Sequence, residues 1–122
     1  MLLYDIIESP LHPDLVPLCI RLGHEHRRFT SQRKAMAAIK RDSPDIVVGD
    51  FFYGFGNNYA GANVSNLDVM LRSLQRFAPA ARIVVLADGQ HAAYVDKLAA
   101  LFQIDSVVQL PAEPAALEAA LS

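Results

Sequence analysis

An aspartate closes one of the most apolar segments of the chain. The segment "DIVVGD" (residues 45–50) is nearly continuous in apolar residues and ends on Asp50, a pattern typical of a central strand covered on both faces. In open parallel sheets, ligands bind beyond the carboxyl ends of the strands. Asp50 in that place could act as a nucleophile toward a phosphoryl group. The structural alternative is a carboxylate that only caps a strand end or binds loop amides.

A second carboxylate follows the first predicted strand. Glu8 lies in "IIESP" (residues 6–10), directly after the apolar stretch "LLYDII" (residues 2–7). One or two carboxylates completed by water are a common magnesium site. Glu8 and Asp50 are therefore weak candidate magnesium ligands.

Strand-like and helix-like periods alternate along the whole chain. The predicted strands cover residues 2–7, 24–29, 45–50, 82–87 and 105–110, and the predicted helices cover residues 15–22, 32–41, 66–77, 91–102 and 114–121. Gly23 is expected to end the first helix, Ser31 and the pair Ser65/Asp68 to cap the second and third, and Pro114 to begin the last. This alternation predicts an α/β fold, with helices on both faces of a doubly wound, five-stranded parallel sheet.

Length, charge and composition exclude several classes of function. The chain of 122 residues suits a single domain over residues 1–122, and its net charge of −2 gives no electrostatic footprint for nucleic acid. No apolar run approaches the roughly 18 residues of a membrane-spanning helix, and no basic segment marks a signal peptide. We therefore expect a cytoplasmic protein that binds neither membrane nor nucleic acid. Cys19, the only cysteine, shares the helical spacing of its leucine neighbours and is interpreted as a core residue.

Four segments resemble the receiver domain of two-component response regulators. They are "IIESP" (residues 6–10), "SPDIVVGD" (residues 43–50), "PAARIVVLAD" (residues 79–88) and "VVQLPAEPAALEAAL" (residues 107–121). Their order and spacing, rather than any one motif, carry the resemblance, which covers nearly the whole chain. It implies a flavodoxin-like sheet with strand order 2-1-3-4-5.

The resemblance also implies roles for single residues. Asp50 occupies the phospho-acceptor position, and Glu8 one of the two acidic positions that hold magnesium, with the Phe52 backbone carbonyl as a further ligand. Four other positions depart from the family pattern: Ile7 replaces the second acidic residue, Ala87 the hydroxyl residue of the fourth strand, Val107 the aromatic switch residue and Leu110 the lysine of the fifth strand. Asp50 thus keeps its position without most of the phosphotransfer machinery. The proline after the lost lysine remains, so a cis Leu110–Pro111 bond is expected.

A long aromatic segment follows Asp50. Residues 51–63 exceed the roughly 2–6 residues usual for such a loop. Phenylalanine, tyrosine and asparagine suit an ordered flap over the site or, as we favour, a recognition surface. The residues assigned to that surface are Phe51, Phe52, Tyr53, Phe55, Asn57, Asn58 and Tyr59.

The histidines give no clear metal site. His24 and His26 have the spacing of a metal pair but no adjacent acidic or cysteine partner, so a solvent-facing strand edge is favoured. His12 and His91 are expected to cap or solvate helix starts. Asp5 lies within a strand, and two interpretations stay open: a buried carboxylate paired with a basic group, or a residue at a frayed edge.

The favoured function is a stand-alone, degenerate receiver-like domain of the two-component type that binds protein partners, a kinase or an output protein, rather than an enzyme. The resemblance places a homodimer on the fourth helix, fifth strand and fifth helix, and the hydrophobic content of 52% fits a covered face. The first alternative is a true phosphoreceiver modified at Asp50 with magnesium. The second is a small-ligand-binding or enzymatic α/β domain that closes the 51–63 loop over a polar pocket beneath Tyr53 and Tyr59.

Overall fold

Strands and helices alternate as predicted. The computed structural model describes residues 1–54 and 65–122. The strands are β1 (Leu2–Ile6), β2 (Glu25–Phe29), β3 (Ile46–Asp50), β4 (Arg82–Asp88) and β5 (Ser106–Leu110). The helices are α1 (Val16–Leu22), α2 (Gln32–Ile39), α3 (Asp68–Phe77), the 3-10 turn η1 (Ala92–Tyr94), α4 (Val95–Ala99) and α5 (Pro114–Leu121).

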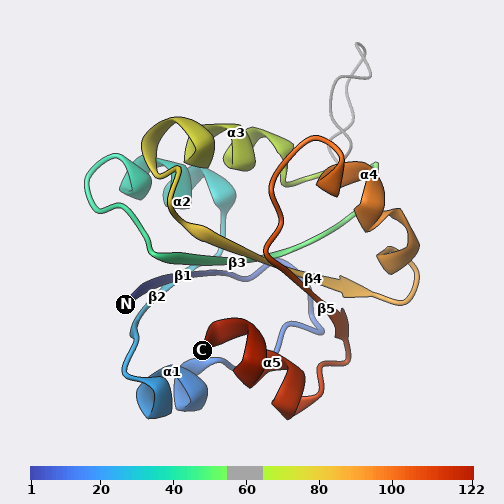
Figure 1. Ribbon diagram of the computed structural model, residues 1–122, viewed down its shortest axis with the longest axis horizontal. Coiled ribbons are helices and arrows are strands. Elements are labelled where there is room, and N and C mark those ends of the chain that lie inside the picture. The colour runs from blue at the N-terminus through green and yellow to red at the C-terminus, as the bar shows by residue number, and fades with distance from the viewer. Residues whose placement is uncertain (55–64) are drawn as a thin grey trace.

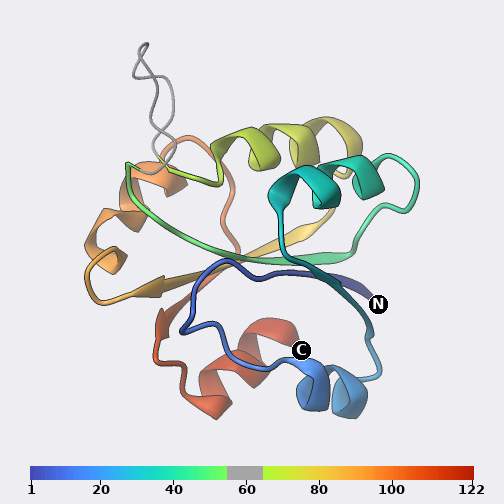
Figure 2. The same ribbon diagram turned by 180° about the vertical axis from the view of Figure 1, so that it is seen from behind.

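The strands form one parallel sheet in the order β2-β1-β3-β4-β5, which confirms the predicted fold class and strand order. Helices α1 and α5 cover one face, and α2, α3 and α4 cover the other (Figures 1 and 2). Alternate residues of a strand point to opposite faces. Accordingly, Val47 packs into the core under α2, α3 and α4, whereas Ile46 and Val48 pack into the core under α1 and α5. Both faces of β3 are therefore buried, as its apolar run predicted.

The helix ends follow local sequence signals. Gly23 ends α1 with a φ of 76°, a left-handed conformation that glycine adopts without a steric penalty. The Ser31 hydroxyl accepts a hydrogen bond from the Lys34 amide at 3.1 Å, as expected of the α2 cap. Before α3, the Asp68 carboxylate accepts hydrogen bonds from the Ser65 amide and hydroxyl. The N-cap residue of α3 is nevertheless Leu67, which has no side-chain cap hydrogen bond, so the predicted position of the cap was wrong.

Other details confirm or correct the expected elements. The Leu110–Pro111 peptide bond is cis, as the family resemblance implied. Cys19 is a buried core residue, and burial raises the pKa of its thiol, with the charge of Asp5 adding to the effect. The single helix predicted over residues 91–102 is instead divided into η1 and a short α4. Within residues 1–54 and 65–122, no helix is both long and apolar enough to span a bilayer.

Candidate functional site

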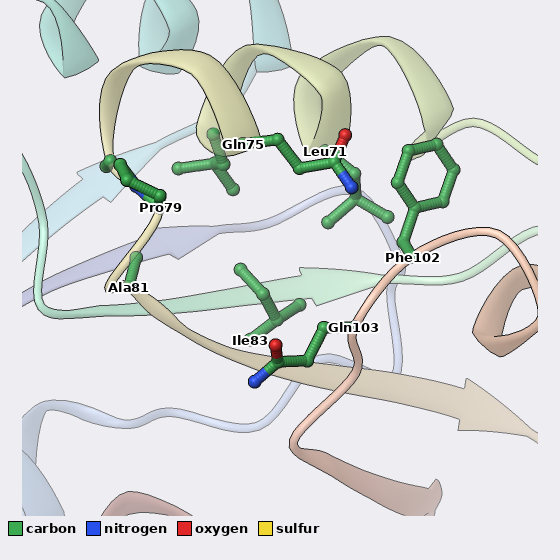
Figure 3. A pocket seen from close by; sticks show the side chains of 9 residues that line it. Leu71, Gln75, Pro79, Ala81, Ile83, Phe102 and Gln103 are labelled. Carbon is green, nitrogen blue, oxygen red and sulfur yellow. The ribbon is translucent and has the colours of Figure 1, made fainter.

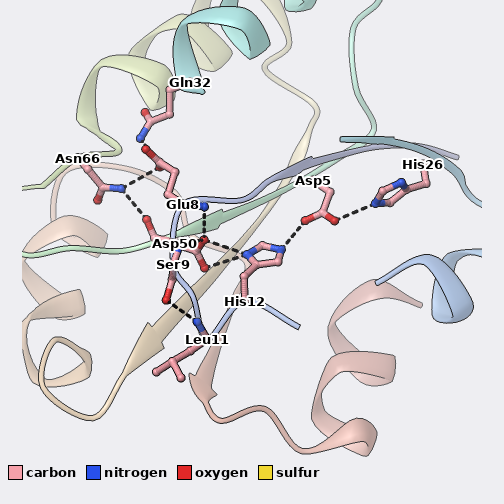
Figure 4. A network of polar contacts seen from close by, with 9 residues as sticks. All are labelled: Asp5, Glu8, Ser9, Leu11, His12, His26, Gln32, Asp50 and Asn66. Atoms are coloured by element: carbon pink, nitrogen blue, oxygen red, sulfur yellow. Dashed lines mark hydrogen bonds and ion pairs between the residues drawn. The ribbon is translucent and has the colours of Figure 1, made fainter. Parts of the chain in front are cut away.

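Asp50 ends β3 with its side chain almost fully buried, at 1% exposure. The chain that follows β1 wraps around this carboxylate. The backbone amides of Glu8 and Ser9 donate hydrogen bonds to Asp50 Oδ2 at 2.9 and 3.0 Å (Figure 4). Two amide donors converging on one oxygen form an anion-binding turn. The loop after β1 therefore binds the Asp50 carboxylate through its backbone.

A buried histidine contacts Asp50 from the same loop. His12 Nδ1 lies 2.9 Å from both carboxylate oxygens of Asp50, and its Nε2 lies 2.5 Å from Asp5 Oδ1. The His12 side chain is only 1% exposed. On its other oxygen, Asp5 contacts His26 Nε2 at 2.8 Å, and the His26 side chain is 15% exposed. Figure 4 shows the resulting row Asp50–His12–Asp5–His26, which runs from the end of β3 across β1 to the edge strand β2.

The His12 side chain is held as a cation. Burial by itself lowers the pKa of an imidazole, but hydrogen bonds to Asp5 and then Asp50, together with their negative charges, raise the pKa of His12 to about 9. At neutral pH an imidazolium therefore lies between two buried carboxylates. Contacts with the Glu8 and Ser9 amides at Asp50, and with His26 at Asp5, stabilise the remaining negative charge.

Glu8 directs its carboxylate away from Asp50. Glu8 Oε1 accepts hydrogen bonds from Gln32 Nε2 at 2.8 Å and from Asn66 Nδ2 at 3.2 Å. Asn66 also donates to the Asp50 backbone carbonyl at 2.7 Å and accepts from the Phe52 amide at 2.8 Å. Asn66 thus joins Glu8 to the chain leaving β3, a role that the sequence did not reveal.

The oxygen atoms predicted to bind magnesium already accept hydrogen bonds within the protein. The Phe52 carbonyl accepts a hydrogen bond from the Asn66 amide at 3.4 Å, and the side chains of Glu8 and Asp50 are bound as described above. Across the two described parts of the chain, no three His, Cys, Asp or Glu residues are arranged to hold a metal ion.

The positions that depart from the receiver pattern lie in different surroundings. Ala87 is buried in the core under α3 and α4, and Leu110 in the core under α1 and α5. Ile7 is half-buried directly after β1. Val107 is 49% exposed on β5. None of these side chains carries a polar group that could contact Asp50.

The aromatic segment after β3 divides into core and surface. Phe51 is 1% exposed and packs in the core, so its assignment to a recognition surface was wrong. Phe52 contacts His91 edge to face, and Tyr53 stacks on Tyr94 with ring centroids 4.1 Å apart. The remaining residues of the predicted surface, Phe55, Asn57, Asn58 and Tyr59, lie outside the described residues.

Two predictions about histidines were also wrong. His12 caps no helix but is buried between Asp5 and Asp50. The pair His24 and His26 does not face solvent: His26 contacts Asp5, and His24 Nε2 contacts the Leu121 carbonyl oxygen at 2.6 Å while its Nδ1 is buried. The first interpretation of Asp5, a buried carboxylate with a basic partner, is correct. One sequence signal for this arrangement exists: Asp5 falls two residues after Leu3 and therefore on the same buried face of β1.

A small cavity lies at the opposite end of the sheet. Its volume is about 130 Å³, and it is bounded by α3, the start of β4 and the segment after α4 (Figure 3). Leu71, Ile83 and Phe102 form its apolar wall, and Gln75 and Gln103 are its polar side chains. No titratable group is among the described residues that line it, so it supports no acid–base or nucleophilic chemistry. Tyr53 is not among its described lining residues, and the pocket predicted beneath Tyr53 and Tyr59 stays a prediction because Tyr59 lies outside the described residues.

Comparisons with known proteins identify the fold. No family model and no curated protein sequence matches the chain. A response regulator receiver domain protein from Clostridium thermocellum superposes with a TM-score of 0.67 at 17% identity, covering 98% of this chain and 89% of that one. An uncharacterised protein from Neptuniibacter caesariensis gives 0.76 at 21% identity, with 98% and 82% covered. A protein assigned to pilus assembly (CpaE2) from Sinorhizobium meliloti gives 0.68 at 16% identity, with 99% and 97% covered. The chain therefore has the receiver fold, as the sequence resemblance predicted.

Proposed function

We propose that the chain is a receiver-like regulatory domain whose acidic site is closed by an internal cation, and that it acts by binding other proteins rather than by phosphotransfer. The observation that carries this proposal is the surroundings of Asp50. The position that resembles a phospho-acceptor is 1% exposed, and its two oxygens already contact His12 and the Glu8 and Ser9 amides.

These contacts oppose phosphorylation. A carboxylate attacks phosphorus in line, through an oxygen that must be free and directed at the phosphoryl group. In this chain His12 would have to leave Asp50 first, and its departure would leave the buried Asp50 carboxylate without its counter-ion. The charge that a metal and a lysine would supply comes instead from the His12 imidazolium.

The same surroundings do not fit magnesium. The second acidic position holds Ile7, which offers no oxygen ligand, and Glu8 is bound by Gln32 and Asn66. An imidazolium 2.9 Å from Asp50 would also repel a divalent cation. We therefore propose that neither magnesium nor a phosphoryl group is part of the function.

An amide NMR titration with magnesium and beryllofluoride, a mimic of the aspartyl phosphate, tests this proposal. We expect no saturable shifts at Glu8, Asp50 or Ala87, because Asp50 has no free oxygen for the mimic. A receiver domain with an intact acidic pair and lysine, titrated in parallel, shows that the reagents work. Saturable shifts in this chain that vanish in Asp50→Asn would overturn the proposal and favour a true phosphoreceiver.

The surface offered to a partner includes the face of α4, β5 and α5. Three large apolar side chains are exposed there, Tyr94 at 40%, Leu101 at 54% and Val107 at 49%. Val107 points to the face of the sheet that carries α4, because its neighbours Val108 and Leu110 belong to the core under α1 and α5. Apolar side chains gathered on one face are typical of an interaction site.

We propose that this face forms a homodimer. Light scattering over a concentration series is expected to give a mass approaching that of two chains, and Leu101→Glu, which places a charge in the contact, is expected to return the protein to a monomer. Val69→Glu, a change of similar exposure on α3, is the matched control and should leave the dimer intact. A monomer at every concentration would exclude the dimer.

A further inference from the structure

The groove between α2 and α3 combines an apolar floor with a basic rim. The two helices lie side by side on one face of the sheet (Figures 1 and 2). Between them is a groove of about 470 Å³, open to solvent along its length. The residues that line it are Arg33, Met36, Ala37 and Lys40 from α2 and Val69, Arg72, Ser73, Arg76 and Phe77 from α3.

The floor of the groove is exposed apolar surface. Val69 is 51% exposed and Phe77 is 36% exposed, and Met36 is half-buried between the helices. Burying such side chains is favourable by about 25 cal/mol per Å² of apolar area. The lining residues follow helical spacing on both helices, so the apolar and the basic side chains share the groove-facing side of each helix.

The rim is cationic in a protein whose net charge is negative. Four of the chain's 11 basic residues line the groove, and no carboxylate is among its described lining residues. Lys40 and Arg76 both lie 5.1 Å from the centre of the Phe77 ring. The acidic residues near these helices are engaged elsewhere: Asp42 pairs with Arg27, and Asp68 accepts hydrogen bonds from Ser65. Arg33, Lys40 and Arg76 therefore leave positive charge along the rim, whereas the fourth basic residue, Arg72, is engaged over the Phe102 ring at 5.7 Å.

From this geometry we propose that the α2–α3 groove binds an acidic amphipathic helix of a partner protein. A third helix packs naturally along the groove between two neighbouring helices. Helix α3 has 10 residues, which corresponds to roughly 15 Å and about three turns of a facing helix. Such a helix would place apolar side chains on Met36, Val69 and Phe77 and carboxylates opposite Arg33, Lys40 and Arg76.

A protein helix fits this surface better than other anionic partners do. The apolar side chains lie in a hollow between two helices and among basic ones, whereas a bilayer needs a broad apolar face that projects outward. The whole chain carries a net charge of −2, which opposes the long-range attraction that nucleic-acid binding uses. The proposal is also independent of the Asp50 site, which lies at the end of β3 on the other face of the sheet.

Fluorescence anisotropy with a synthetic peptide tests the proposal. The probe is a labelled, helix-stabilised peptide of roughly 14 residues, with leucines at helical spacing and glutamates flanking them; the control peptide carries glutamine in place of every glutamate. We expect saturable binding of the acidic peptide only. Lys40→Glu combined with Arg76→Glu should weaken it by about tenfold or more, because attraction becomes repulsion at two positions. Lys34→Glu, on α2 but outside the groove, is the matched control and should change the affinity by less than about threefold.

Further measurements distinguish a protein helix from other ligands of the α2–α3 groove. Shifts in an amide NMR titration with the acidic peptide should fall on α2 and α3, and Asp50→Asn should bind it with unchanged affinity, so that this result does not depend on the proposed state of the acidic site. Equal binding of the glutamine peptide, shifts confined to the α4–β5–α5 face, or no binding would overturn the proposal. So would binding of phosphatidylserine vesicles or of a single-stranded oligonucleotide that exceeds peptide binding and is abolished by the same charge reversals.

Discussion

Replacing His12 with alanine is expected to lower the free energy of unfolding by about 3–5 kcal/mol, because it leaves two buried carboxylates without their shared cation. The side chains of Asp5 and Asp50 are only 2% and 1% exposed, so water cannot replace the imidazolium without opening the loop. For a domain of this size, the same loss corresponds to a decrease in Tm of roughly 10–20 °C. Urea denaturation followed by circular dichroism, near pH 6.5, measures the effect.

The control is another histidine with few partners in the protein. His91 accepts a hydrogen bond from the Tyr53 amide at 3.1 Å and contacts Phe52, so His91→Ala is expected to cost only about 1 kcal/mol. The variant His12→Ala/Asp50→Asn then separates charge from packing. If the stranded charge is the cause, Asp50→Asn should recover about 1–2 kcal/mol in the His12→Ala background. A loss of less than 1 kcal/mol for His12→Ala, or strict additivity of the two changes, would contradict the assigned ion pairs.

The fold was largely predictable because it depends on local patterns. Apolar runs such as residues 45–50 have no polar face, so they indicate strands covered on both sides, and the alternation with helices then requires a parallel sheet. The order of the strands is not a local property. It came from the resemblance to receiver domains, and the pairing of β1 with both β2 and β3 confirms it.

The site was predictable only in part. The positions of Asp50 and Glu8 follow from where their strands end. The partner of Asp50 does not, because His12 lies 38 residues away in an irregular segment between β1 and α1 that has no periodic pattern. The one sequence feature that indicated such a partner was Asp5, because a carboxylate on a buried strand face requires a hydrogen-bond donor or a cation. The sequence contains several basic candidates for that role. The path of the loop after β1 selects His12, and the pairing of β1 with β2 brings His26 to Asp5.

Phe51 shows why a cluster of aromatic residues is an ambiguous signal. The segment after Asp50 contains both residues that continue the core and residues that reach the surface, and composition alone cannot separate them. The Phe51 amide still donates to the Leu86 carbonyl at 2.8 Å, so the chain has not yet left the sheet and its side chain packs inside. Tyr53 is the first of these aromatic side chains with more than a third of its surface exposed.

The second large effect is a decrease in stability as the pH rises through the titration range of His12. Below about pH 6.5 the imidazole is protonated in both the folded and the unfolded chain, so the ion pairs contribute fully. Between pH 6.5 and about 9 the unfolded chain loses this proton while the folded chain keeps it, so the free energy of unfolding falls with pH. Above that range the contribution is lost. Because one pKa unit corresponds to about 1.4 kcal/mol, the total loss is on the order of 3 kcal/mol.

The charged groups around His12 define how this prediction is tested. Asp5 faces it from β1 and Asp50 from the end of β3, His26 follows from β2, and Cys19 on α1 has a raised thiol pKa that titrates at higher pH with the same sign. Urea midpoints are therefore compared with those of His12→Gln, because groups that do not contact His12, such as Cys19, contribute equally to the two pH profiles and cancel in their difference. The His12 C2-proton resonance gives the pKa directly, with a midpoint expected near pH 9. A midpoint at or below its ordinary value of 6.5, with parallel stability profiles, would mean that His12 is neutral in the folded protein. Asp50 would then lack its internal cation, and the electrostatic reason for excluding magnesium would no longer hold, so that exclusion would rest only on Ile7 and on the hydrogen bonds that Gln32 and Asn66 donate to Glu8.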